Sequence, residues 1–151
     1  MIQRIQTLFL LAVIILSSLM LTGDLIVMND PTGSMFSIQF AGLSLANSGI
    51  EQRLWPLSVL IAIVPILALI TIFLFKNRRT QMRMVMLVLL LSLGTLLLGA
   101  FYVIMFDKKI PVTIVWKIKA VFPLISAILA WLAYRSILKD EQHVKSYDRL
   151  R

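Results

Sequence analysis

The sequence has no cysteine, one histidine and few charged residues, and each shortage excludes a class of protein. Without cysteine there is no disulfide, no thiolate metal site and no thiol-disulfide relay. The single histidine, His143, has no second ligand at metal-binding spacing. Phosphate-loop, zinc-protease and serine-nucleophile motifs are missing too, so we expect no enzyme, no catalytic residues, no cofactor and no metal.

Apolar residues, by contrast, make up 60% of the 151 residues, while charged residues make up 15%. The mean hydropathy of +0.93 is typical of a chain solvated mainly by lipid. Four apolar stretches reach the length of about 20 residues that a transmembrane helix needs. They run from about 5–25, 55–75, 82–106 and 112–138. We therefore predict an all-α membrane protein, with residues 1–151 forming one domain built on a bundle of four transmembrane helices.

The first stretch could also be read as a signal peptide, because Arg4 precedes its apolar core. Its apolar run is longer than that of a typical signal peptide, and no convincing cleavage site of small residues follows. We expect it to be a retained helix.

The lysines and arginines predict the orientation, because loops rich in them stay in the cytoplasm. Ten of the fifteen lie on one side of the predicted spans: Arg4, Lys76, Arg78, Arg79, Arg83, Arg135, Lys139, Lys145, Arg149 and Arg151. This side holds both termini, which we place in the cytoplasm, with a tail at 139–151. The net charge of +8 then reports topology and attraction to anionic lipid, and we expect no nucleic-acid partner.

The only long loop, at about 26–53, faces outward in this topology. Within it Phe36, Ile38 and Phe40 alternate with polar residues, and Gly42 follows. Such alternation bounded by glycine predicts a short β-hairpin. An isolated hairpin is only marginally stable in water, so it should rest on the helix ends as a lid or offer a docking surface to another protein.

Three charged residues near the outer membrane surface form a candidate polar site. Asp24 lies near the end of the first span, where a carboxylate needs a partner or access to water. Lys117 and Lys119 lie at the start of the fourth span, and in a helix they point about 200° apart. One of them could therefore pair with Asp24, or all three could be interface anchors alongside Trp116.

Two prolines are candidate helix kinks: Pro65 in the second span and Pro123 in the fourth. Freed carbonyls beside prolines bind ions in transporters, but in most membrane helices prolines are tolerated bends. The middles of the spans carry no ionisable residue, which favours the second interpretation.

Small residues allow membrane helices to approach each other closely. Each of three spans carries a set of them: Ser17, Ser18 and Thr22 in the first, Ser92, Thr95 and Gly99 in the third, and Ser126, Ala130 and Ala133 in the fourth. These sets are sufficient for packing within one bundle and also permit a partner.

The two ends, MIQRIQTLFLL and LAYRSILKDEQHVKSYDRLR, resemble those of a bacterial family of small four-span membrane proteins that form a domain of unknown function. The resemblance extends over the whole chain in length and span order. It implies a Gram-negative bacterium and hence the inner membrane, but no activity and no site residues.

The resemblance directs attention to the two cytoplasmic ends. Our leading hypothesis is a non-enzymatic structural or accessory subunit of a multi-protein inner-membrane complex, surrounded by the lipid bilayer and bound to other membrane-protein subunits. The candidate cytoplasmic contact consists of Gln3, Arg4, Gln6, Lys139, Asp140, Glu141, Lys145, Asp148, Arg149 and Arg151.

Two alternatives remain open from the sequence. One is a small homo-oligomeric transporter or channel, which would need a polar route past Pro65 and Pro123. The other is a protein that binds anionic lipid or a lipid carrier through the outward lysines.

Overall fold

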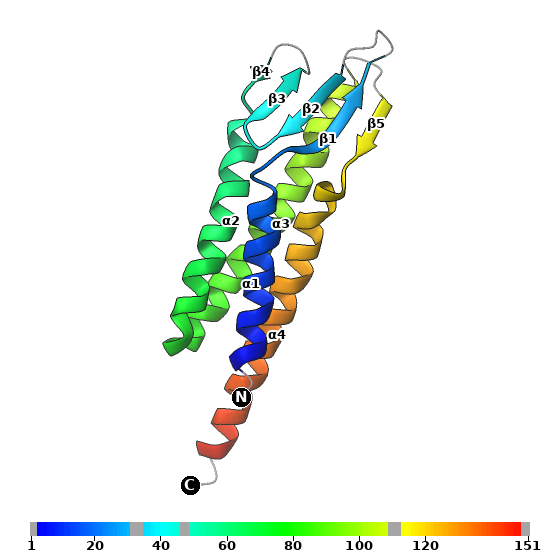
Figure 1. The fold of residues 1–151 in the computed structure, drawn as a ribbon. Coiled ribbons are helices and arrows are strands. Elements are labelled where there is room, and N and C mark those ends of the chain that lie inside the picture. Colours follow the sequence, from blue (N-terminus) through cyan, green and yellow to red (C-terminus); the bar gives the residue numbers. More distant parts are fainter. Residues whose placement is uncertain (1–2, 31–34, 46–48, 109–112, 149–151) are drawn as a thin grey trace.

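The computed structural model describes residues 3–30, 35–45, 49–108 and 113–148, which fold into helices and strands. The helices are α1 (Gln3–Leu19), α2 (Trp55–Phe73), α3 (Arg78–Asp107) and α4 (Phe122–Asp148), with short 3-10 helices η1 (Leu74–Lys76) and η2 (Ile118–Val121). The four long helices form an elongated bundle with a β-sheet at one end (Figure 1). α1 and α3 each pack on α2 and α4, so the helices close into a ring.

The inside of the ring is filled by apolar and small side chains. Leu10, Val13, Ala68, Val88 and Ala130, which come from all four helices, are buried completely. Ala68 and Ala130 are small and let the helices approach each other closely, which suits packing within a membrane.

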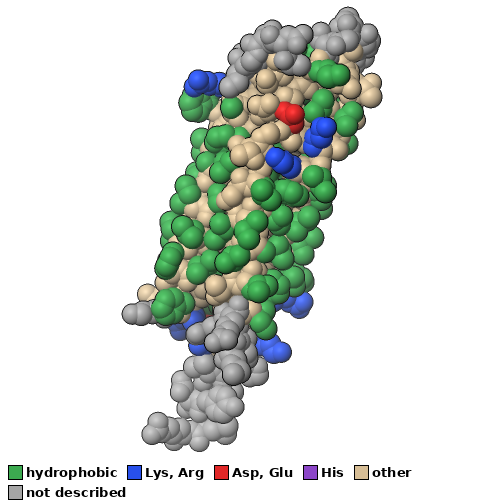
Figure 2. All heavy atoms as spheres, viewed as in Figure 1, with side chains coloured by type: hydrophobic (Ala, Val, Ile, Leu, Met, Phe, Trp, Pro, Cys, Tyr) green, Lys and Arg blue, Asp and Glu red, His purple; other side chains and the backbone are tan. Residues whose placement is uncertain are grey.

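The outer faces of the helices are apolar as well. Leu8, Phe73 and Leu97 are each at least 66% exposed, which is unfavourable in water for so many large side chains. In the space-filling view, hydrophobic side chains cover the helical part of the molecule and basic ones lie near its two ends (Figure 2). This distribution is compatible with a membrane location.

Three segments are long and apolar enough to cross a membrane: Trp55–Phe73, Arg78–Asp107 and Ile118–Glu141. The first helix is shorter, and its apolar part runs from Ile5 to Leu19. These three segments are compatible with a membrane location.

The sheet is antiparallel and has five strands in the order β4-β3-β2-β1-β5. The strands are β1 (Asp24–Asn29), β2 (Met35–Gln39), β3 (Gly42–Leu45), β4 (Gly49–Gln52) and β5 (Thr113–Trp116). Ile26, Met28 and Ile38 of the sheet are buried in one cluster with Leu57 of α2 and Val103 of α3. The sheet is thus packed onto the bundle.

The predicted fold class is wrong in its outward part, because the sheet is a substantial part of the fold and not a short hairpin. β2 and β3 do pair where the hairpin was expected, with Phe36 opposite Leu45. They are, however, two of the three inner strands of a larger sheet. Its edge strand β5 comes from the segment between α3 and α4, which was assigned to a helix.

The ends of the first and fourth helices also differ from the predicted spans. α1 ends at Leu19, and Gly23, with a φ of 69°, redirects the chain into β1, so Asp24 begins a strand. In the other segment Thr113–Trp116 pairs with β1 and α4 begins only at Phe122. Pro123 is therefore the second residue of α4, where proline is tolerated, whereas Pro65 lies inside α2.

Ile38→Ala tests the packing of the sheet on the bundle. Ile38 is 1% exposed, so its truncation should lower the free energy of unfolding by about 2–5 kcal/mol. Met35→Ala on the same strand is the control, because Met35 is 55% exposed and should change stability by no more than about 0.5 kcal/mol. Thermal unfolding in detergent measures both. Equal losses would mean that the sheet is not packed as described.

Candidate functional site

At the sheet end of the bundle, within the described part of the chain, Asp24 forms no ion pair with Lys117 or Lys119, although Lys119 lies at the turn just before it. Asp24 begins β1, and its Oδ1 accepts a hydrogen bond of 2.8 Å from Nε2 of Gln39, the residue opposite it on β2. This carboxylate is therefore satisfied by the sheet itself.

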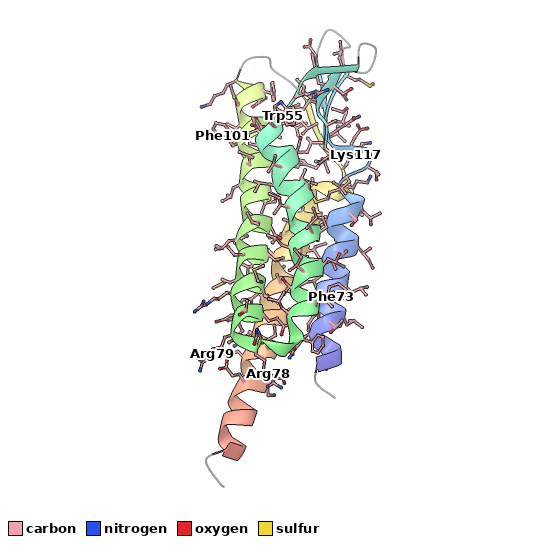
Figure 3. The ribbon with its side chains drawn as sticks, turned by 90° about the vertical axis from the view of Figure 1, so that its left-hand side faces the viewer. Trp55, Phe73, Arg78, Arg79, Phe101 and Lys117 are labelled. Atoms are coloured by element: carbon pink, nitrogen blue, oxygen red, sulfur yellow. The ribbon has the colours of Figure 1, made fainter. Side chains whose placement is uncertain are left out.

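The two lysines at this end have different environments. The ammonium group of Lys119, in η2, donates a hydrogen bond to the main-chain carbonyl of Thr22, just after α1. Lys117 lies exposed between β5 and η2, at the sheet end of the bundle (Figure 3). Lys119 therefore links the α1–β1 turn to the start of α4, and Lys117 is available to lipid headgroups or water.

A second group of polar residues lies at the opposite end of the bundle, where three of the helices each place a side chain inside. Gln6 of α1, Gln81 of α3 and Asp140 of α4 are between 5% and 8% exposed. Arg78, at the first position of α3, lies next to them, and we call these four residues the polar junction. Burial of so many polar groups is costly unless they are hydrogen-bonded.

Hydrogen bonds within the junction join helices that are distant in sequence. Nε2 of Gln6 donates to Oδ2 of Asp140. The Arg78 guanidinium donates to the main-chain carbonyl of Asp140 at 3.2 Å. Nε2 of Gln81 donates to the carbonyl of Thr71 in α2 at 3.3 Å. The junction thus connects α1 to α4, α4 to α3, and α3 to α2.

The junction lines a cavity of about 180 Å³, whose other walls are Thr7, Ile72, Phe75 and Ile137. Asp140 contributes an unusual feature: its Oδ1 is buried and has no hydrogen-bond partner within the described part of the chain. Because a buried unpaired carboxylate oxygen is costly, it is a candidate ligand-binding group.

The remaining residues of the predicted cytoplasmic contact lie around the junction or beyond the described side chains. Lys139 is exposed, and Oε1 of Glu141 is 4.0 Å from Nε of Arg79, which lies with Arg78 at the same end (Figure 3). The following residues lie outside the described side chains: Gln3, Arg4, Lys145, Asp148, Arg149 and Arg151. Gln6 and Asp140, which were predicted to face a partner, are instead buried against each other.

The middle of the bundle separates this cavity from the sheet end. Completely buried Leu10, Val13, Val85 and Val88 fill the ring above the junction. Nearer the sheet, buried hydroxyl groups follow, and Ser17 and Ser92 bond to the carbonyls of Val13 and Val88 in their own helices. These hydroxyls are thus satisfied locally.

Sequence reasoning missed Arg78 and Gln81 as site residues, because Arg78 was interpreted only as a topology signal. A pattern did exist: the two are three residues apart and therefore share one helix face. Gln81 stands just before a long apolar run, where a polar residue on a buried face needs a partner.

Gln6→Ala tests the junction. It removes the donor to Asp140 and leaves the buried carboxylate without that bond, so the free energy of unfolding should fall by about 1–3 kcal/mol. Lys139→Ala, at an exposed neighbour, should change it by no more than about 0.5 kcal/mol.

The pair can be isolated by a double-mutant cycle with Asp140→Ala. Because the two side chains bond directly, the cycle should give a coupling energy of about 0.5–3 kcal/mol in detergent unfolding. Strictly additive losses would show that the two residues do not interact.

No curated protein and no solved structure matches this chain. One family model does match, and it covers residues 2–150, nearly the entire sequence. The chain therefore belongs to the family described as a domain of unknown function, DUF4293.

Proposed function

We propose that this protein is a non-enzymatic accessory subunit of a multi-protein complex in the bacterial inner membrane, and that it binds its partner through the cytoplasmic end of α4. The observation that carries the proposal is the length of α4. This helix continues to Asp148 and projects beyond the ends of the other helices (Figure 1).

The projecting segment starts where the bundle ends. Asp140 is held against Gln6 of α1, and eight further residues continue the helix, a length of about 12 Å. Its sequence, from Glu141 to Asp148, carries charges of both signs together with Val144 and Tyr147. Lipid insertion does not require such a segment, and a projecting helix with charged and apolar side chains suits recognition by a partner.

The polar junction gives this segment a fixed base. Gln6 of α1 binds the side chain of Asp140, and Arg78 of α3 binds its main-chain carbonyl. α4 therefore leaves the bundle at a residue that is held by two other helices. A preorganised helix loses less conformational entropy when it binds. Basic side chains around the junction, among them Arg79 and Lys139, support the placement of this end of the bundle on the cytoplasmic side.

The packing of the bundle favours this role over a transporter or channel. Transport would need a polar route through the ring, and the described middle of the ring holds Leu10, Val13, Val85 and Val88, all completely buried.

In-cell photo-cross-linking tests the proposal. A photoreactive residue at Val144 or Tyr147 of the full chain should give one discrete adduct with another protein, because these positions lie on the projecting segment. The control position is Leu97, which is 69% exposed on the apolar outer face of α3 and should give mainly lipid adducts. Recovery of only the protein itself, in this experiment and in a mild-detergent pull-down, would refute an accessory role.

A matched variant separates binding from folding. Replacing residues 142–151 by a flexible linker of equal length keeps Asp140 and its bond to Gln6. It should therefore preserve the midpoint of thermal unfolding. It should also abolish the adduct that forms when the photoreactive residue is placed on the partner protein instead.

A further inference from the structure

The cavity at the polar junction combines an anionic and a cationic group within about 180 Å³. Asp140 and Arg78 both line it, but the guanidinium binds the main-chain carbonyl of Asp140 and leaves Oδ1 of the carboxylate unpaired. Two opposite charges therefore line one cavity, and Arg78 forms no hydrogen bond with Oδ1 of Asp140. This arrangement suits a ligand that itself carries both charges.

The negative subsite is Oδ1 of Asp140. The residue is 8% exposed, and its other oxygen already accepts the hydrogen bond from Gln6. A buried carboxylate oxygen is satisfied best by a charged N–H donor, because such hydrogen bonds are the strong ones. The subsite therefore selects an ammonium group that has hydrogens to donate.

The positive subsite is Arg78 together with the beginning of α3. A guanidinium has five N–H donors, and the bond to Asp140 uses one of them. Arg78 is also the first residue of a 30-residue helix that has no side-chain cap, so free main-chain N–H groups add to the positive charge there. A helix N-terminus beside an arginine favours a phosphate.

The location of the cavity indicates where such a ligand comes from. Arg78 and Arg79 lie at one end of an apolar bundle, where a membrane meets water (Figure 3). On that side Ile72 and Phe75 provide apolar walls, and Phe75 is 54% exposed. A phospholipid headgroup at this depth would enter the cavity while its acyl chains stay in the bilayer.

We infer that the polar junction binds the headgroup of phosphatidylethanolamine, with its primary ammonium at Asp140 and its phosphate at Arg78 and the N-terminus of α3. The volume agrees, because a cavity of about 180 Å³ far exceeds the roughly 10–15 Å³ that one water molecule needs and leaves room for the aminoethyl arm. Phosphatidylcholine is rejected because its trimethylammonium group has no N–H to donate. Phosphatidylglycerol is disfavoured because its hydroxyl groups are neutral donors, which bind a buried carboxylate more weakly than an ammonium group does.

Competition among lipids tests the inference. The full-length protein is placed in nanodiscs with equal amounts of the three lipids and extracted in mild detergent, and the retained lipid is counted by native mass spectrometry. Phosphatidylethanolamine should be retained about tenfold or more over phosphatidylcholine, as expected for one strong charge-assisted hydrogen bond. Equal retention of the three lipids would overturn the inference.

Three variants identify the subsites. Asp140→Asn keeps an oxygen for Gln6 and replaces the unpaired oxygen by an N–H donor, so it should preserve folding and abolish the preference. Arg78→Gln weakens the phosphate subsite, which all three lipids share, so it should lower the total amount of retained lipid while phosphatidylethanolamine stays preferred. The control is Arg83→Gln, which removes an equal charge from an exposed position of α3 and should leave both the retained amount and the preference unchanged. A preference that survives Asp140→Asn would refute the ammonium subsite.

A free solute could offer the same chemistry, and a second measurement distinguishes it. Soluble ethanolamine and phosphoethanolamine are titrated against the purified protein while its thermal unfolding is followed. If either raises the midpoint and phosphatidylethanolamine is not enriched, the cavity binds a solute and the lipid is ruled out. The result does not depend on any partner protein, so the accessory role stands or falls separately.

Discussion

The fold depends on close contact between helices at small side chains. In lipid, association of helices gains nothing from removing apolar surface from water, so it relies on dense packing and internal hydrogen bonds. Ala68, Ala130 and Ala133 are completely buried and let the helix backbones approach each other. The hydroxyl groups of Ser17 and Ser92 donate hydrogen bonds to main-chain carbonyls of their own helices. Larger side chains such as Leu10 and Val88 fill the space between the helices, and others such as Leu8 and Leu97 are exposed on the outer faces. The bundle therefore combines small residues at the close contacts with apolar residues both inside and outside.

The two middle helices could be predicted from hydropathy to within four residues at each end, since spans expected at 55–75 and 82–106 correspond to Trp55–Phe73 and Arg78–Asp107. The sheet could not. β1 and β5 directly adjoin long apolar runs. A short apolar strand next to an apolar helix has no periodicity in the sequence that distinguishes it from a continuation of that helix. Their pairing, with Ile26 opposite Trp116, joins segments that no local pattern connects. These two strands can be recognised only from their pairing with segments distant in sequence.

For the candidate sites, too, the sequence identified polar residues but not the residues that they contact in the fold. Sequence alone drew attention to Gln6 and Asp140 as polar residues next to spans, but assigned them to a surface. Whether a polar residue faces water or another helix depends on the rotation of the helix, which one sequence does not specify. Asp24 was noticed as a carboxylate needing a partner, and the partner is Gln39 on the opposite strand, not a lysine. The expected small faces were correct for Ser17, Ser92 and Ala130, whereas Ser18 and Thr22 are exposed.

The short first helix has a consequence for the surrounding bilayer. With 17 residues α1 is about 26 Å long, less than the roughly 30 Å of a typical hydrocarbon core, while α3 with 30 residues is longer than required. Around such a bundle the bilayer meets a different hydrophobic thickness on each side. In a bilayer, lipid next to α1 would have to thin, and α3 would have to tilt or the lipid beside it thicken. The unequal lengths of α1 and α3 would therefore deform a surrounding bilayer asymmetrically.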